Sequence, residues 1–357
     1  MKLILPLLII LLLLSYVLWH VWTLVPLPHW GKWVLAALGI ACFAVEIIGF
    51  TGLLDQLPLG IASFCYNLGN KALIIIFYLM MAFLLLDMGR LLHIVPKELL
   101  HDNWGTSITL TLLMAGIFLY GGIHYHHKVR GALALDSGGR MEKPLKLVMA
   151  SDLHIGYGNR RTDLAKWVDL INAEQPDMVL IAGDIVDFSM RPVLEEEMAD
   201  EFRRIKAPIY ACLGNHEYYA GISDAEAFYS RAGIQLLEDS LVHTHGIALV
   251  GRIDRTSKRR KPLSAYPSPD TEYTIVMDHQ PYPLEEAEQA GVDFQLSGHT
   301  HQGQIWPLSW IVNALYECAW GSHQRGKTHY YVSSGLGVWG AKYRIGTQSE
   351  YVVATIR

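Results

Sequence analysis

Residues Leu145–His154, with the sequence LKLVMASDLH, join a short apolar run to a carboxylate and an imidazole. The run Leu145–Ala150 is typical of a buried strand, and Asp152 and His154 follow where that strand would end. In α/β folds, ligands bind in the crevice beyond the carboxyl ends of the strands. The pair alone is weak evidence for a metal site, because most such pairs are ordinary polar residues.

The same pattern recurs along the following 150 or so residues. Apolar runs that predict strands at 178–182, 209–213, 274–277 and 294–296 each end in polar residues of metal-ligand or acid–base type: Asp184, Asn215, His216, His279, His299 and His301. Helical spacing at 162–174 and a predicted helix at 194–205 separate the early strands, which indicates an α/β sandwich. Mixed imidazole, carboxylate and amide donors favour Mn, Fe or Zn over Ca or Mg.

With these motifs in this order, the sequence resembles the calcineurin-like metallophosphoesterase family over about Leu145–Arg357. The matching motifs are Asp152-x-His154, Gly183-Asp184-x-x-Asp187, Gly214-Asn215-His216-Glu217, His279 and Gly298-His299-x-His301. The resemblance implies a two-sheet sandwich flanked by helices that holds two divalent metal ions, with Mn favoured and Fe or Zn as alternatives.

The resemblance also assigns roles to individual residues. It implies that one ion is bound by Asp152, His154, Asp184 and His301, and the other by Asp184, Asn215, His279 and His299. Asp184 would be shared between the ions, and a shared anionic ligand is what a close pair of cations needs. His216 would be the catalytic acid, and Asp187 and Glu217 would support the metal-site groups.

The first third of the 357-residue chain is strongly apolar and predicts a membrane domain. Four segments have about the length and composition of spans: Leu3–Trp22, Trp33–Leu54, Ala72–Leu92 and Ile108–Tyr125. A signal peptide is the alternative for the first of them. We therefore expect a four-helix transmembrane domain at 1–125, a polar linker at 126–144 and a metallophosphoesterase domain at 145–357.

Basic residues near the span ends predict the orientation. Lys128 and Arg130 follow the fourth span, and the side that carries more Lys and Arg is the cytoplasmic one. We therefore expect a multi-pass membrane protein, of the inner or plasma membrane if bacterial, with a cytoplasmic catalytic domain. Glu46 lies inside the second span, where a carboxylate is costly; it is either functional or paired within the bundle.

Two further segments bear on the substrate. The stretch 251–261 carries Arg252, Arg255, Arg259 and Arg260, which predicts contacts to phosphates or anionic headgroups, with a solvated loop as the alternative. The stretch Ile305–Trp320 is rich in tryptophan and apolar residues. It predicts a loop that reaches the lipid interface or cradles an acyl chain, with ordinary core packing as the alternative.

Together these features predict a membrane-anchored phosphohydrolase with a paired metal centre, whose partners are the lipid bilayer and a phosphorylated lipid. Similarity to the membrane-anchored branch of the family implies hydrolysis of UDP-2,3-diacylglucosamine in lipid A synthesis as one activity. Hydrolysis of soluble nucleotides is the alternative within the same class. A membrane sensor or transporter with a metal-binding domain is the alternative of another class. A net charge of −5 gives no indication of nucleic-acid binding, and the sequence leaves the oligomeric state open.

Overall fold

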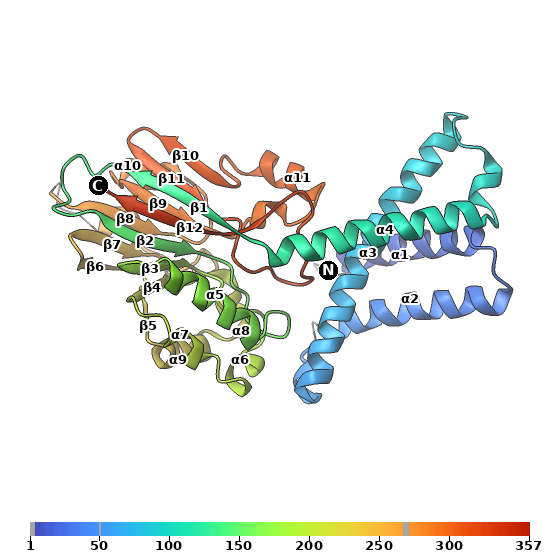
Figure 1. Cartoon of the computed structure of the whole chain (residues 1–357), viewed down its shortest axis with the longest axis horizontal. Coiled ribbons are helices and arrows are strands. Elements are labelled where there is room, and N and C mark those ends of the chain that lie inside the picture. The colour runs from blue at the N-terminus through green and yellow to red at the C-terminus, as the bar shows by residue number, and fades with distance from the viewer. Residues whose placement is uncertain (1–3, 50, 267–270) are drawn as a thin grey trace. The chain divides into compact units, whose positions relative to one another are not determined.

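The computed structural model describes residues 4–49, 51–266 and 271–357, with side chains from Leu11 onward. The chain forms two compact units, Met1–Tyr120 and Gly121–Arg357. Figure 1 labels the helices and strands of both. The first unit is helical and the second contains both β-sheets. The boundary lies within one long helix, α4 (Trp104–His126), whose last turns belong to the second unit.

The first unit contains α1 (Ile4–Leu24), α2 (His29–Gly49), α3 (Leu59–Leu91) and most of α4, with short 3-10 helices at Leu53–Gln56 and Lys97–Leu100. Among the described residues, α2, α3 and α4 are long and apolar enough to cross a membrane. The predicted span Leu3–Trp22 begins outside the described residues, and the described side chains of α1, Leu11–Leu24, form a shorter apolar helix. The third predicted span is the second half of a single helix that starts at Leu59.

Polar groups meet inside this helical unit at two places. The Tyr16 hydroxyl donates to Asp87 Oδ2 at 2.8 Å, and His20 Nε2 lies 2.9 Å from the same oxygen. Glu46 is buried between α2 and α3, where a Cβ on Gly69 would lie 2.7 Å from Glu46 Oε2. Asp87 is therefore paired, as an apolar surrounding requires, whereas Glu46 Oε1 is buried without a hydrogen-bond partner among the described residues. The His20–Asp87 contact joins two helices and was not predicted from the sequence.

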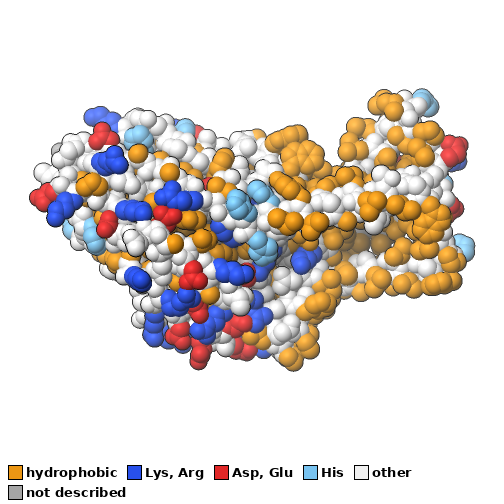
Figure 2. Space-filling model, viewed as in Figure 1, with side chains coloured by type: hydrophobic (Ala, Val, Ile, Leu, Met, Phe, Trp, Pro, Cys, Tyr) orange, Lys and Arg blue, Asp and Glu red, His pale blue; other side chains and the backbone are white. Residues whose placement is uncertain are grey.

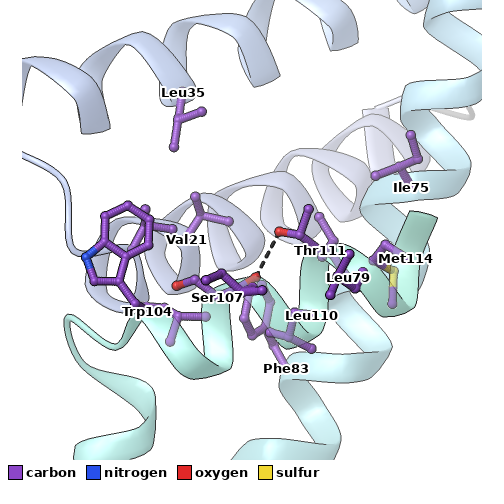
Figure 3. A pocket seen from close by; sticks show the side chains of 14 residues that line it. Val21, Leu35, Ile75, Leu79, Phe83, Trp104, Ser107, Leu110, Thr111 and Met114 are labelled. Atoms are coloured by element: carbon purple, nitrogen blue, oxygen red, sulfur yellow. Dashed lines mark hydrogen bonds between the residues drawn. The ribbon is translucent and has the colours of Figure 1, made fainter. Parts of the chain in front are cut away.

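A cavity of about 440 Å³ lies between helices of the first unit. Figure 3 shows the side chains that line it. Its lining is mainly apolar, with Val21, Leu35, Phe83 and Met114 among the side chains. The Thr111 hydroxyl at its wall donates to the carbonyl of Ser107 at 2.8 Å within α4. No acid, imidazole or thiol is among the described lining residues, so this cavity has no group for acid–base or metal chemistry.

The second unit is built on two six-stranded sheets. The first has the order β1 (Lys128–Leu135), β12 (Ser349–Ile356), β2 (Leu145–Ala150), β3 (Met178–Ala182), β4 (Ile209–Cys212) and β5 (Ile234–Leu236). The second has the order β10 (Gly321–Arg325), β11 (Thr328–Val332), β9 (Phe294–Ser297), β8 (Tyr273–Met277), β7 (Ile247–Gly251) and β6 (Ser240–Thr244).

Strands β2 to β5 are parallel, and so are β7, β8, β9 and β11. The helices of this unit are α5 (Arg161–Ala173), α6 (Arg191–Glu195), α7 (Ala199–Phe202), α8 (Asn215–Ala220), α9 (Ile222–Ala232), α10 (Glu285–Gln289) and α11 (Leu308–Leu315). The strand and helix pattern predicts an α/β sandwich, and the two sheets flanked by helices are those that the family resemblance implies.

Burial on both faces explains the continuous apolar run of β2. Leu147 and Met149 belong to the core between the sheets, whereas Val148 and Ala150 belong to the core shared with Trp167 of α5. Successive side chains of a strand point to opposite faces, so a strand covered on both sides needs apolar residues at every position. The continuous apolar run is the reason that strands such as β2 could be predicted from the sequence.

The interpretation of 126–144 as a linker is wrong for residues 128–135. These form β1, which pairs in parallel with β12 from Lys128↔Ser349 to Leu135↔Ile356. The partner strand lies at the other end of the chain, so no local pattern reveals the pairing. Only His127 separates α4 from β1, so a helix that is long and apolar enough to cross a membrane joins the first strand of the second unit almost directly.

Candidate metal centre

The predicted ligands lie on loops that follow β2, β3, β4, β8 and β9. Five of them have a left-handed backbone conformation: Asp152 (φ 53°), His154 (φ 45°), Asp184 (φ 51°), His299 (φ 71°) and His301 (φ 50°). Such a conformation costs a non-glycine residue about 1–3 kcal/mol and persists where the surroundings impose it. The loops are therefore bent so that side chains from separate strands converge.

The first ligand group combines Asp152, His154 and His301, all buried. His301 Nε2 lies 3.3 Å from Asp152 Oδ1 and 3.1 Å from His154 Nε2. His154 Nε2 also lies 3.7 Å from Asp184 Oδ2, which connects this group to the next. Three donor atoms facing one point, two of them imidazole nitrogens, make a set that suits a transition metal.

The second group combines Asp184, His279 and His299. His279 Nε2 lies 3.1 Å from Asp184 Oδ2, and His299 Nδ1 lies 2.9 Å from Asn215 Oδ1. Asp184 therefore contacts donors of both groups, and we call it the shared carboxylate. The structure brings all seven predicted ligands into these two adjoining sets.

The tautomer of His279 tests whether the site fits a cation. Its Nδ1 lies 2.8 Å from the carbonyl oxygen of Ala182, to which it can only donate, so Nε2 carries the lone pair whenever the ring is neutral. That Nε2 is buried and has no hydrogen-bond partner among the described residues. A lone pair facing the oxygen of Asp184 is unfavourable unless a proton or a cation lies between them. The residues present therefore fit a metal ion.

Electrostatics favour cation binding at the same point. Although burial opposes ionisation, His301, His154 and His279 hold the pKa of Asp152 below its usual range. Burial likewise opposes ionisation of Asp184, but His279 and His216 keep the pKa of that carboxyl well below normal. The carboxyl groups are thus anionic at neutral pH, in a buried place where negative charge requires a positive partner.

Gly214 makes the approach of two loops possible. A Cβ at this position would lie 2.1 Å from Asp184 Oδ1 and 2.6 Å from the Asp184 amide nitrogen. No side chain fits in that space, and the adjacent His216 amide donates to Asp184 Oδ1 at 2.9 Å. Glycine before Asn215 is therefore required by the position of the shared carboxylate.

Glu217, predicted as a supporting residue, is fully buried beneath the shared carboxylate. Its Oε1 accepts from the amides of Ile185 and Val186 and from the Tyr229 hydroxyl, at 2.8, 3.2 and 2.6 Å. Its Oε2 accepts from the amides of Asp184 and Gly214, at 3.2 and 2.7 Å. One carboxylate thereby ties together the two loops that carry Asp184 and Asn215.

His216, predicted as the catalytic acid, is the second residue of α8 and lies beside both groups. Its Nδ1 lies 3.0 Å from Asp187 Oδ1, and its ring lies edge-on to Phe188 at 4.7 Å between centroids. Asp187 is thus placed to orient the ring through Nδ1, which leaves Nε2 for a reacting group. His216 is also close enough to His154 and Asp184 to act as a ligand, and the geometry permits both roles.

The arginine-rich segment is held by acidic residues of the protein itself. Arg252 is 1% exposed and contacts Glu286 at 3.1 Å. Arg260 is paired with Asp278, the residue before His279, through both terminal nitrogens. Arg255 lies 3.5 Å from Glu286, so the predicted phosphate contacts do not form a free basic patch. Arg259 is exposed and has no side-chain partner among the described residues, so its contact with a phosphate stays a prediction.

Two residues near the site were not predicted from the sequence. Arg344 is fully buried and donates to the carbonyl of His301 at 2.6 Å, as well as to the carbonyl of Ser334. Ser151 donates to Asp152 Oδ2. Ser151 immediately precedes Asp152 and could have been suspected from its position. Arg344 lies in a loop without a recognisable pattern, and only tertiary contacts reveal that it fixes the His301 loop.

Comparison with known proteins agrees with this geometry. Residues 145–303 match the family model of the calcineurin-like phosphoesterases. The chain is 30% identical to an uncharacterized metallophosphoesterase of Campylobacter jejuni, over 70% of this chain and 69% of that protein.

Two further relatives are matched over less of their length. An uncharacterized metallophosphoesterase of Helicobacter pylori is 32% identical, and the match spans 59% of each chain. A transmembrane protein with metallophosphoesterase domain of Bos taurus is 32% identical over 58% of this chain and 51% of its own. With a full set of ligand residues at the matched motifs, this chain belongs to the calcineurin-like metallophosphoesterase family.

Proposed function

We propose that the protein hydrolyses phosphoesters with the aid of two divalent ions, manganese in the first place and iron or zinc as alternatives, since the donors are mixed imidazole, carboxylate and amide groups. The observation that carries this proposal is the contact of Asp184 with His154 of one ligand group, at 3.7 Å, and with His279 of the other, at 3.1 Å. Two adjoining cations supply a clamp for the phosphoryl group and an activated water.

The protein's own contribution centres on His216. Its imidazole is buried beside both ligand groups and is oriented by Asp187. In the proposed reaction, Nε2 donates a proton to the leaving oxygen, so that the alcohol or phosphate departs without a full negative charge. The centroids of the Phe188 and Tyr219 rings lie 4.7 and 5.2 Å from that of the His216 ring. These two aromatic side chains make the surroundings of the imidazole apolar.

A lipid-linked phosphoester or pyrophosphate is the substrate class that we propose. A cavity of about 410 Å³ is lined mainly by apolar and aromatic residues, Tyr282, Leu284, Leu315 and Tyr316 among them, and also by Glu285 and Glu317. The Tyr316 ring lies 6.4 Å from that of His299. An aromatic and aliphatic wall at this distance suits an apolar group attached to the phosphate. The long apolar helices of the same chain would keep the enzyme where such substrates are found.

We further propose that the catalytic unit faces the cytoplasm, because Lys128 and Arg130 directly follow α4. Hydrolysis of UDP-2,3-diacylglucosamine is one activity compatible with that side of the membrane.

The decisive test is purification of the full chain in detergent with manganese, followed by a substrate panel. The panel contains UDP-2,3-diacylglucosamine, an acyl-chain phosphate, a soluble nucleotide and a simple aryl phosphate, with products identified by mass. We expect hydrolysis of the lipid substrates to exceed that of the soluble ones, and Asp184→Asn to abolish all of it. A fully metallated protein that cleaves none of them would refute the proposal.

A further inference from the structure

Helix α11 exposes large apolar side chains, which a surface helix normally buries. Ser309 is its one buried residue, whereas Trp310 is 65%, Ile311 55% and Leu315 74% exposed. A helix on a soluble domain normally buries its apolar side and exposes its polar side. Trp306, just before the helix, is also exposed and lies 5.3 Å from Trp310 between ring centroids. We call these four apolar side chains the α11 face; Figure 2 shows hydrophobic side chains gathered where α11 lies.

The α11 face is attached firmly to the metal centre. The Thr300 hydroxyl, between two predicted ligands, donates to the carbonyl of Ala319, so the segment that carries α11 leaves and returns at the edge of the site. The Trp306 amide donates to the carbonyl of Ile345 at 2.7 Å, and Ile305 forms a β-bridge with Ile345. These contacts at both ends of the segment therefore hold the exposed side chains of the α11 face in a fixed position.

The loop that holds the start of the α11 segment also contacts the last turns of α4. The Arg344 amide donates at 3.0 Å to the carbonyl of Gly121, which lies in the part of α4 that belongs to the catalytic unit. Residues 344–345 thus connect the last turns of α4 with the start of the α11 segment. Since α4 is long and apolar enough to cross a membrane, the α11 segment is tied to the last turns of a candidate membrane helix.

We propose that the α11 face inserts into the interfacial layer of the membrane in which the chain is anchored. Tryptophan is enriched at this layer, because its ring is apolar and its N–H is polar. A helix with one apolar side lies in the plane of the layer, with that side buried about 5–10 Å. The hydrogen bond between Arg344 and Gly121 of α4 favours lipid over a second copy of the chain as the occupant.

Insertion would have a consequence for catalysis that rests on the proposed function. Both ends of the α11 segment are fixed beside the metal centre, and Leu315 contributes to both the α11 face and the cavity beside His299. A lipid-linked phosphate could therefore reach the ligand groups while its acyl chains remain in the bilayer.

The test measures lipid contact in the full chain. A single cysteine replaces Trp310, in a background with Cys42→Ser and Cys65→Ser; Cys212 and Cys318 are buried. It is labelled with an environment-sensitive fluorophore, and the protein is reconstituted into vesicles of phosphatidylcholine and phosphatidylglycerol that contain a spin-labelled acyl chain. The matched control is Ser230→Cys on the exposed side of α9. We expect several-fold stronger quenching at position 310 than at position 230.

Equal, weak quenching at both positions would overturn the proposal. So would cross-linking between labelled copies without lipid quenching, which would identify a second copy as the occupant.

The double variant Trp310→Ser with Ile311→Ser gives a second readout. We expect unchanged hydrolysis of a soluble aryl phosphate and a several-fold loss for a lipid substrate in vesicles; equal loss on both would refute the link to substrate access. If the native protein cleaves neither substrate, the proposed function fails, but the quenching still decides the insertion of α11.

Discussion

Replacing Glu217 by glutamine is the sharpest test of how the metal centre is held. The five donors that Glu217 accepts include four backbone amides, which cannot turn away. A glutamine amide keeps one accepting oxygen and places N–H groups where the other oxygen was. The Tyr229 hydroxyl can rotate away from the new N–H groups, but the backbone amides cannot. Whichever way the glutamine is oriented, the two backbone amides that face its nitrogen lose their acceptor.

The cost follows from the number of amides left without a partner. A buried donor that loses its acceptor costs about 1–3 kcal/mol, so two of them cost about 2–6 kcal/mol. In a domain of 150–250 residues, each kcal/mol lowers the melting temperature by about 2–4 °C. We therefore expect a fall of at least about 4 °C. We also expect weaker metal binding, because the affected amides belong to the loops that carry Asp184 and Asn215.

The assay is thermal unfolding of the full chain in detergent, with the metal content of each sample measured by mass spectrometry. Tyr229→Phe is the matched control, since it removes one donor to the same carboxylate and adds none; the expected cost is about 0.5–1.5 kcal/mol. If Glu217→Gln unfolded within about 1 °C of the native protein and kept its metal, the role assigned to Glu217 would be wrong.

Three other substitutions test separate parts of the structure. His216→Ala should lower turnover about 10²- to 10⁴-fold with metal content unchanged, by elemental analysis and initial rates; loss of metal as well would make His216 a ligand. Gly214→Ala should deplete the metal, because its Cβ would lie 2.1 Å from the shared carboxylate, whereas Gly116→Ala, which has no atom within 4 Å of the new Cβ, should retain it. Arg260→Ala should destabilise the protein by about 1–3 kcal/mol in thermal unfolding, since Asp278 loses its two hydrogen bonds from Arg260 and keeps only the contact with Arg252 at 3.9 Å; a stable variant that has lost only lipid-substrate affinity would restore the substrate-binding role.

The strands nearest the site were predictable because burial on both faces leaves a continuous apolar run. β3 has the predicted bounds, Met178–Ala182, and β2 the predicted Leu145–Ala150. The edge strand β1 was missed for the opposite reason: its residues are partly exposed, and its pairing with β12 depends on the far end of the chain.

The kinds of ligand, their order and their places at strand ends were determined by the sequence alone, because each ligand directly follows a locally recognisable strand. Only the tertiary structure decided which charged side chains are free to bind a phosphate. Arg252 and Arg260 belong to a basic stretch of the sequence, but in the folded protein they are paired with carboxylates from distant segments. The tertiary structure also decided that the tryptophan-rich segment exposes its apolar side. Exposure and charge pairing depend on which distant segments become neighbours, and that is settled only when the two sheets pack together.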